Sequence, residues 1–117
     1  MPDADYIARW GPGPHDTADA LIYRQPGWLL LVRRDDGSWA LPGGFLEPHE
    51  TPLDAAIREA WEECGIRLDV HWLMRVVARK DPERDPRAWI RTVAHRFDLP
   101  ADWRGSANAD AKVTLYA

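Results

Sequence analysis

The sequence of 117 residues lacks the features that mark disulfide-stapled or membrane-spanning chains. Its single cysteine, Cys64, excludes an internal disulfide. No apolar run approaches the roughly 20 residues of a membrane span, and residues 1–3 (MPD) do not begin like a secretory signal. A net charge of -4 without a basic block argues against a general nucleic-acid binder. We therefore expect one cytoplasmic domain, with neither nucleic acid nor membrane as a partner.

What the chain does contain is a short acidic helix that follows a glycine turn. Thr51 is a suitable N-cap, Pro52 fits the first helical position, and Gly65 is a left-handed stop, so a helix is predicted over residues 52–64. Its apolar residues recur at three- and four-residue spacing and form one stripe that must face a core: Leu53, Ala56, Ile57, Ala60 and Cys64. The place of Cys64 on this stripe indicates a small buried hydrophobe rather than a nucleophile.

Three glutamates of this helix, Glu59, Glu62 and Glu63, lie three and four residues apart and share another face. They repel one another, and the last two lie where the helix dipole favours cations, each effect costing a few tenths to about 1 kcal/mol. Arg58, which can reach Glu62, supplies one compensating charge. The cluster therefore indicates a site for a hard divalent cation, Mg²⁺ or Mn²⁺, against the alternative of an ordinary solvated face.

The spacing of these residues adds a second argument. From Gly44 the sequence reads glycine, five residues, Glu50, seven residues, Arg58-Glu59, apolar Ala60, one residue, Glu62-Glu63, one residue, Gly65 and apolar Ile66. This stretch resembles the signature of the Nudix hydrolases at every fixed position.

The resemblance implies a set of roles for the matching residues. Glu59, Glu62 and Glu63, with the backbone carbonyl of Gly44, would bind the divalent cations. Glu50 and Arg58 would pair and hold the turn against the helix. In this chemistry the cation neutralises phosphate oxygens and activates a water, and one glutamate takes the proton of that water.

The family hydrolyses nucleoside diphosphates linked to another group. Outside the signature, the segments WALPGGF and TVAHRFDL resemble the branch that acts on ADP-ribose and related dinucleotides. We therefore expect a nucleotide substrate, with ADP-ribose first. The alternatives are a (deoxy)nucleoside triphosphate pyrophosphohydrolase and a Nudix-like module that senses a nucleotide without cutting it.

Several side chains outside the helix are further candidates for the site. Arg34 is a candidate phosphate contact, with an ordinary surface position as the alternative. Phe45 is a candidate wall of the substrate pocket, with an ordinary core position as the alternative. The resemblance also allows a base from a later loop instead of a helix glutamate. The sequence offers three aspartates for that role: Asp98, Asp102 and Asp110. Among seven tryptophans, the candidates for stacking on a base are Trp28, Trp61 and Trp72, although packing is the more common role for any one of them.

The remaining pattern predicts an α/β fold with a mixed sheet. Residues 1–16 form an N-terminal arm, docked or loose, and residues 17–117 the domain. Strands are predicted over 17–24 and 28–34 as a hairpin, and over 39–41, 68–79, 88–99 and 112–116, with 80–87 as a charged loop. The Nudix fold is similar: a mixed sheet between helices in an α/β/α sandwich. The pattern lacks the usual C-terminal helix, which would cover the second face of the sheet. Three explanations are open: a shortened chain, a homodimer in which the partner covers that face, or an unusually compact member of the family.

Overall fold

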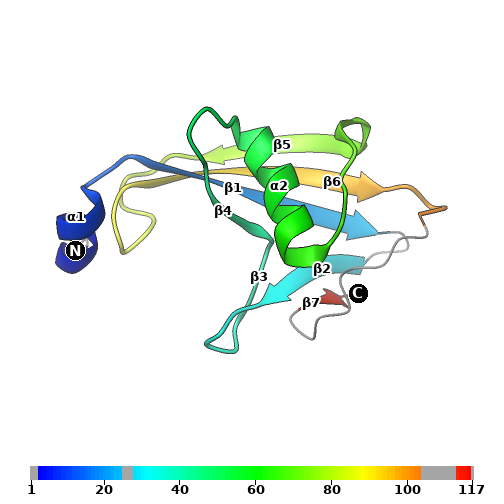
Figure 1. Ribbon diagram of the computed structural model, residues 1–117, viewed down its shortest axis with the longest axis horizontal. Coiled ribbons are helices and arrows are strands. Elements are labelled where there is room, and N and C mark those ends of the chain that lie inside the picture. Colours follow the sequence, from blue (N-terminus) through cyan, green and yellow to red (C-terminus); the bar gives the residue numbers. More distant parts are fainter. Residues whose placement is uncertain (1–2, 25–27, 104–112, 117) are drawn as a thin grey trace.

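The computed structural model describes residues 3–24, 28–103 and 113–116, and in these ranges seven strands form one mixed sheet. The strand order is β3-β2-β1-β6-β5, with β4 beside β1 and β7 beside β2. The helices are α1 (Ala4–Trp10), α2 (Pro52–Cys64) and the 3-10 turn η1 (Val70–Trp72); the strands are β1 (His15–Arg24), β2 (Trp28–Arg33), β3 (Trp39–Ala40), β4 (Gly43–Phe45), β5 (Leu73–Arg79), β6 (Ile90–Leu99) and β7 (Val113–Tyr116). Helix α2 lies across one face of the sheet (Figure 1). The predicted α/β class with a mixed sheet is confirmed.

Strand β1 is the centre of this sheet. Along one edge it pairs in parallel with β6 over its full length, from His15 opposite Ile90 to Arg24 opposite Leu99. Its other edge is shared, because β4 pairs with its first half and β2 pairs only at its end. The predicted hairpin of β1 and β2 is therefore present, but its strands diverge and leave room for β4 beside the middle of β1.

Helix α2 begins and ends where the sequence predicts. The hydroxyl of Thr51 accepts a hydrogen bond from the backbone N–H of Asp54 (3.1 Å), and the Asp54 carboxylate accepts one from the N–H of Thr51 (3.3 Å). Gly65 closes the helix in the left-handed conformation, with φ 71° and ψ 22°. The predicted apolar stripe faces the sheet, and the fully buried helix residues are Ala55, Ala56, Ala60 and Cys64.

The core lies between α2 and the sheet. Small side chains meet where the helix crosses β1, since Ala18 and Ala20 of the strand lie in the same cluster as the alanines of α2. Larger side chains complete the cluster, among them Ile22, Phe97 and Leu99. On β6, the face with Phe97 and Leu99 packs in the core. Alanine on both surfaces brings the helix backbone close to the strand, which matters for the site.

Two predicted strands begin later than expected. The strand predicted over residues 68–79 begins at Leu73, because Leu68 is buried in the core and Asp69 caps η1 by accepting the N–H of His71 (2.9 Å). The pairing of β5 with β6 shifts in register between Leu73 and Arg75, which marks an irregularity or bulge at the start of β5. The strand predicted over 88–99 begins at Ile90. Lys112, at the start of the last predicted strand, lies outside the described residues.

The N-terminal segment contains a helix that the sequence did not predict. Asp3 caps α1 by accepting the N–H groups of Asp5 (3.0 Å) and Tyr6 (3.1 Å). The N–H of Asp3 in turn donates to the carbonyls of Pro86 and Arg87 (3.0 Å each), so the segment is docked on the loop before β6. Helix α1 lies beyond one end of the sheet (Figure 1).

The described ranges show one α-helix on the sheet, α2, and no second helical layer. Over the same ranges, no helix combines the length and the hydropathy needed to cross a membrane.

Candidate active site

Two glycines of β4 form the middle of the candidate site. Gly43 pairs with Asp19 and Gly44 with Ala18. A Cβ on Gly43 would overlap the Asp19 carboxylate, and a Cβ on Gly44 would come within 2.8 Å of the Glu59 carboxylate. Paired residues of an antiparallel ladder point to the same face, so Asp19 lies on one side of β4 and Glu59 on the other. Only the backbone of β4 separates the acidic face of α2 from the opposite face of the sheet.

Carboxylates gather along this backbone. Oε1 of Glu63 accepts a hydrogen bond from the N–H of Gly43 (2.9 Å), and the Glu63 carboxyl lies beside that of Glu59. Burial, together with the Glu59 carboxylate and the charge of Asp19, raises the pKa of Glu63 to about 7. Burial also raises the pKa of Asp19. No pattern in the sequence pointed to Asp19, which lies beside Gly43 because β1 pairs with β4.

Arg58 ties the start of the signature to the helix. Its Nε and Nη2 donate to the two oxygens of Glu50 (2.7 and 3.1 Å), and Nη2 also reaches the carbonyl of Phe45 (3.2 Å). Hydrogen bonding to Arg58 lowers the pKa of Glu50, and the Glu50 carboxylate raises the pKa of Arg58. This bidentate ion pair is the one that the resemblance implied.

The three signature glutamates do not share one environment. Nη1 of Arg58 donates to Glu59 (2.8 Å) and to Glu62 (3.1 Å), and the Glu62 side chain is 52% exposed. The structure therefore brings Glu59 together with Glu63 and leaves Glu62 beside Arg58. Over the described ranges, no three His, Cys, Asp or Glu side chains converge as a ready-made metal site. The donors nonetheless suit a hard divalent cation, because they are carboxylate oxygens with an excess of negative charge and Gly44 leaves space beside Glu59.

A polar cleft of about 370 Å³ borders β4. Two predicted contacts, Arg34 and Phe45, line it together with Gly43 and Gly44. The loop between β5 and β6 contributes further lining residues, namely Arg84, Asp85 and Arg87. The sequence indicated only a solvated loop there, since a charged segment with prolines is typical of surface.

The arginines make this cleft suitable for an anion. Arg84 donates to the hydroxyl of Thr92 (2.8 Å), and Arg87 forms an ion pair with Asp85 (2.9 Å) that lowers the pKa of Asp85. Three lining residues are arginines (Arg34, Arg84, Arg87) and two are aspartates (Asp19, Asp85), so positive charge prevails among them. Guanidinium groups in a concave site are the usual ligands of phosphate.

Comparison with known proteins gives the family. Residues 13–113 match the family model described as the NUDIX domain, so the chain belongs to the Nudix family. Nudix hydrolases generally use a divalent metal.

Individual relatives cover most of this chain. An ADP-ribose pyrophosphatase from Methanocaldococcus jannaschii is 35% identical over 89 residues, which are 74% of this chain and 52% of the relative. Diphosphoinositol polyphosphate phosphohydrolase 2 from Mus musculus is 32% identical over 99 residues, 81% of this chain and 54% of the relative. The chain thus spans about half the length of these curated relatives.

Among solved structures, a bifunctional NMN adenylyltransferase/ADP ribose pyrophosphatase from Francisella tularensis is similar, with a TM-score of 0.78 and 28% identity. The similarity covers 95% of this chain and 37% of that one. It confirms the predicted resemblance of the fold to Nudix hydrolase structures.

The ion pair of Glu50 with Arg58 is expected to stabilise the fold. We expect Glu50→Gln to lower the free energy of unfolding at pH 7 by about 1–3 kcal/mol, because the bidentate pair loses its charge. The folded pKa of Glu50 is lowered, so its contribution is present above about pH 4.5 and disappears as the pH falls through the lowered pKa. Urea unfolding at pH 7 and pH 3 measures both effects. Glu47→Gln is the control, since Glu47 is 63% exposed and 3.8 Å from Arg58; an equal loss in both variants would contradict the assignment.

Glu63 is expected to have the opposite effect on stability when no metal is present. Its folded pKa is raised, so its ionisation costs stability as the pH rises from about 4.5 through 7. We expect Glu63→Gln to raise the free energy of unfolding at pH 8 by about 1–2 kcal/mol after solvent screening, and to have no such effect at pH 4. Thermal unfolding in a chelating buffer measures this change.

The control for that measurement is Glu62→Gln, which changes an exposed carboxylate of the same helix. We expect it to alter stability by no more than about 0.5 kcal/mol at either pH. A clear loss of stability in Glu63→Gln at pH 8 would mean that the carboxylate holds the fold together.

Proposed function

We propose that the chain hydrolyses the pyrophosphate bond of a nucleoside diphosphate linked to another group, with ADP-ribose or a related dinucleotide as the first candidate. One observation carries the proposal: acidic side chains and an arginine-lined cleft adjoin the same short strand, β4. The cleft offers positive charge for a diphosphate, and the acids offer ligands for a cation and a base for a water. The similarity to an ADP-ribose pyrophosphatase supports this choice of substrate.

The cation in this proposal is Mg²⁺, with Mn²⁺ as the alternative. Glu59, Glu63 and Glu62 would hold it, with the carbonyl of Gly44. Asp19 adds a carboxylate on the other side of β4. When bound, the cation would neutralise phosphate oxygens and lower the pKa of a water.

Side chains of the protein carry out substrate binding, proton transfer and the positioning of the helix. The arginines of the cleft bind and orient the phosphates, so that the reacting phosphorus lies beside β4. A helix glutamate accepts the proton of the attacking water; the Gly43 N–H fixes the carboxylate of Glu63 for such a role. Glu50 and Arg58 position α2 against the segment that follows β4.

Two alternatives to the proposed hydrolase predict different outcomes when the chain is given a panel of substrates. A sensing module would bind the nucleotide without cutting it, and a triphosphate pyrophosphohydrolase would prefer nucleoside triphosphates. The similarity to a diphosphoinositol polyphosphate phosphohydrolase adds a substrate class without a base, which the three arginines of the cleft would also suit. A cytoplasmic location and a homodimer stay predictions.

A substrate panel tests the proposal. The chain is incubated with Mg²⁺ and ADP-ribose, NADH, deoxynucleoside triphosphates, diadenosine polyphosphates or a diphosphoinositol polyphosphate, and products are separated by chromatography. We expect mononucleotide products from the nucleotide compounds of the panel, with ADP-ribose giving AMP and ribose 5-phosphate. Tight binding without turnover anywhere in the panel would favour the sensing module instead.

Variants of the helix carboxylates test the site itself. We expect Glu59→Gln and Glu63→Gln to lower kcat by at least about 100-fold, the usual contribution of general base catalysis, while the fold is retained. Asp98→Asn and Asp102→Asn test the rival base from a later segment; Asp110, the third candidate, lies outside the described residues. Asp98 pairs with Arg96 (2.8 Å) and Asp102 is exposed in a turn, so we expect less than about a threefold change. Loss of activity in an aspartate variant but not in the glutamate variants would move the base to that segment.

A further inference from the structure

An aromatic pocket of about 380 Å³ adjoins the cleft. Its four lining residues all carry aromatic rings: Tyr6, Trp10, His15 and Phe45. Two come from the unpredicted helix α1, one from the start of β1 and one from the end of β4. The volume is in the range of small-ligand sites. Trp10 is 58% exposed and Phe45 43% exposed, which leaves apolar ring surface for a ligand to cover.

Three of the four rings of this pocket are already packed against one another. Tyr6 and His15 meet edge to face, with ring centroids 5.8 Å apart at 82°, and His15 meets Phe45 at 6.5 Å and 87°. Nε2 of His15 lies 2.9 Å from the carbonyl of Gly11, which can only accept, so this nitrogen carries the proton. In the neutral ring, Nδ1 is then an acceptor. These contacts fix the walls before any ligand arrives.

The pocket and the cleft are parts of one continuous surface. Phe45 lines both of them. Arg87 lines the cleft, and its guanidinium lies 5.8 Å from the ring centroids of Tyr6 and Phe45. A molecule with its flat end among the aromatic rings would therefore carry its adjoining group toward the arginines.

This juxtaposition selects among possible ligands. A cation would be repelled by Arg87, and a purely apolar molecule would leave the arginines of the cleft without a partner. A phosphate compound without a ring system would leave the aromatic surface uncovered. A base joined through a sugar to phosphate matches both parts, because any base has a π-face that stacks on aromatic side chains.

We propose that the aromatic pocket binds the nucleobase of a substrate whose phosphates occupy the arginine-lined cleft, and that α1 thereby selects nucleotides over phosphate compounds without a base. Tyr6 and Trp10 are binding residues under this proposal. The inference deepens the proposed function, since it names the part of the substrate that gives specificity, but it is tested by binding rather than by turnover.

The test compares two probes that differ only in the base. AMP and ribose 5-phosphate are titrated into the full chain with Mg²⁺, and affinities are measured by calorimetry. We expect AMP to bind more tightly, and Trp10→Ala to weaken AMP by about 5- to 100-fold, the range of one stacked base, without changing ribose 5-phosphate. Trp10→Phe keeps an aromatic ring and should restore most of the AMP affinity.

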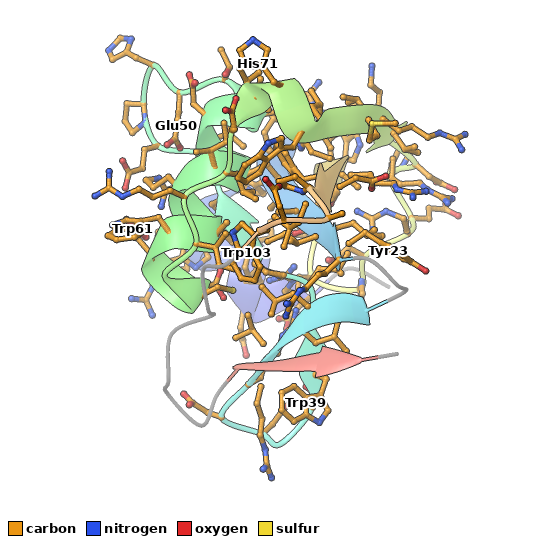
Figure 2. The ribbon with its side chains drawn as sticks, turned by 90° about the vertical axis from the view of Figure 1, so that its right-hand side faces the viewer. Tyr23, Trp39, Glu50, Trp61, His71 and Trp103 are labelled. Carbon is orange, nitrogen blue, oxygen red and sulfur yellow. The ribbon has the colours of Figure 1, made fainter. Side chains whose placement is uncertain are left out.

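Trp39→Ala is the matched control, because Trp39 lies on β3, is 37% exposed and lines neither the pocket nor the cleft. Figure 2 shows it at the bottom of the molecule, far from Glu50 and Trp61 near α2. We expect this variant to bind both probes like the unchanged protein. Equal affinities for the two probes, or a Trp10→Ala variant that behaves like Trp39→Ala, would overturn the inference.

The binding test and the substrate panel can refute the nucleobase site and the hydrolase activity independently of each other. Selective AMP binding that depends on Trp10, with no turnover of any compound, would keep the nucleobase site and refute the hydrolase. Turnover of ADP-ribose with Trp10→Ala unchanged in AMP affinity would keep the hydrolase and refute the nucleobase site.

Discussion

The site depends on one short backbone pairing, that of β4 with the middle of β1. Three residues of β4 pair with Thr17, Ala18 and Asp19, and two of the three are glycines. With no side chain on either face at Gly43 and Gly44, the strand is thin enough for Glu59 to lie against it from one side and Asp19 from the other. Without glycine here, those carboxylates would be forced apart. The thinness of β4 is thus the constraint that joins the helix acids to the cleft.

The position of α2 follows from the same constraint. Glu59 and Glu63 reach β4 because alanines on the helix and on β1 let the two backbones approach closely. Burying acids near one another is unfavourable, as the raised pKa of Glu63 shows. The Gly43 N–H and the guanidinium of Arg58 offset part of that cost. A bound cation would offset more, which is why a strained acidic surface of this kind is typical of a functional site.

The sequence alone predicted those features of the fold and the site whose residues lie close together along the chain. The caps, the stop and the apolar spacing of α2 lie within fifteen residues, and Arg58, the partner of Glu50, lies in the second turn of the same helix. Both features could therefore be predicted without a structure. Spacing alone could not separate Glu62 from Glu63. They are neighbours on one helix, and their environments differ because only Glu63 meets a backbone N–H of β4.

The residues that the sequence did not reveal are brought in by long-range pairing. Parallel alignment of β1 with β6 places the loop before β6 beside the cleft, so Arg84 and Arg87 join residues from far along the chain. Trp61 and Trp72, which the sequence suggested for stacking, do not line the aromatic pocket, whereas Trp10 does, because its helix docks at the same end of the sheet. No local pattern carries that information.

The docking of α1 also explains why the two parts of the surface belong together. The loop before β6 supplies arginines to the cleft, and the same loop accepts the N–H of Asp3 and exchanges backbone hydrogen bonds around Trp89 with Pro12 and His15. The helix that carries the aromatic rings is therefore fixed to the segment that carries the guanidinium groups. A shift of this loop would move the aromatic rings of α1 and the arginines of the cleft together. The separation between the aromatic pocket and the cleft is therefore set by one segment of the protein, and not by two independent loops. Under the proposed nucleobase site, selection of nucleotides over phosphate compounds without a base depends on how α1 sits on this loop, while the signature helix and β4 can stay unchanged.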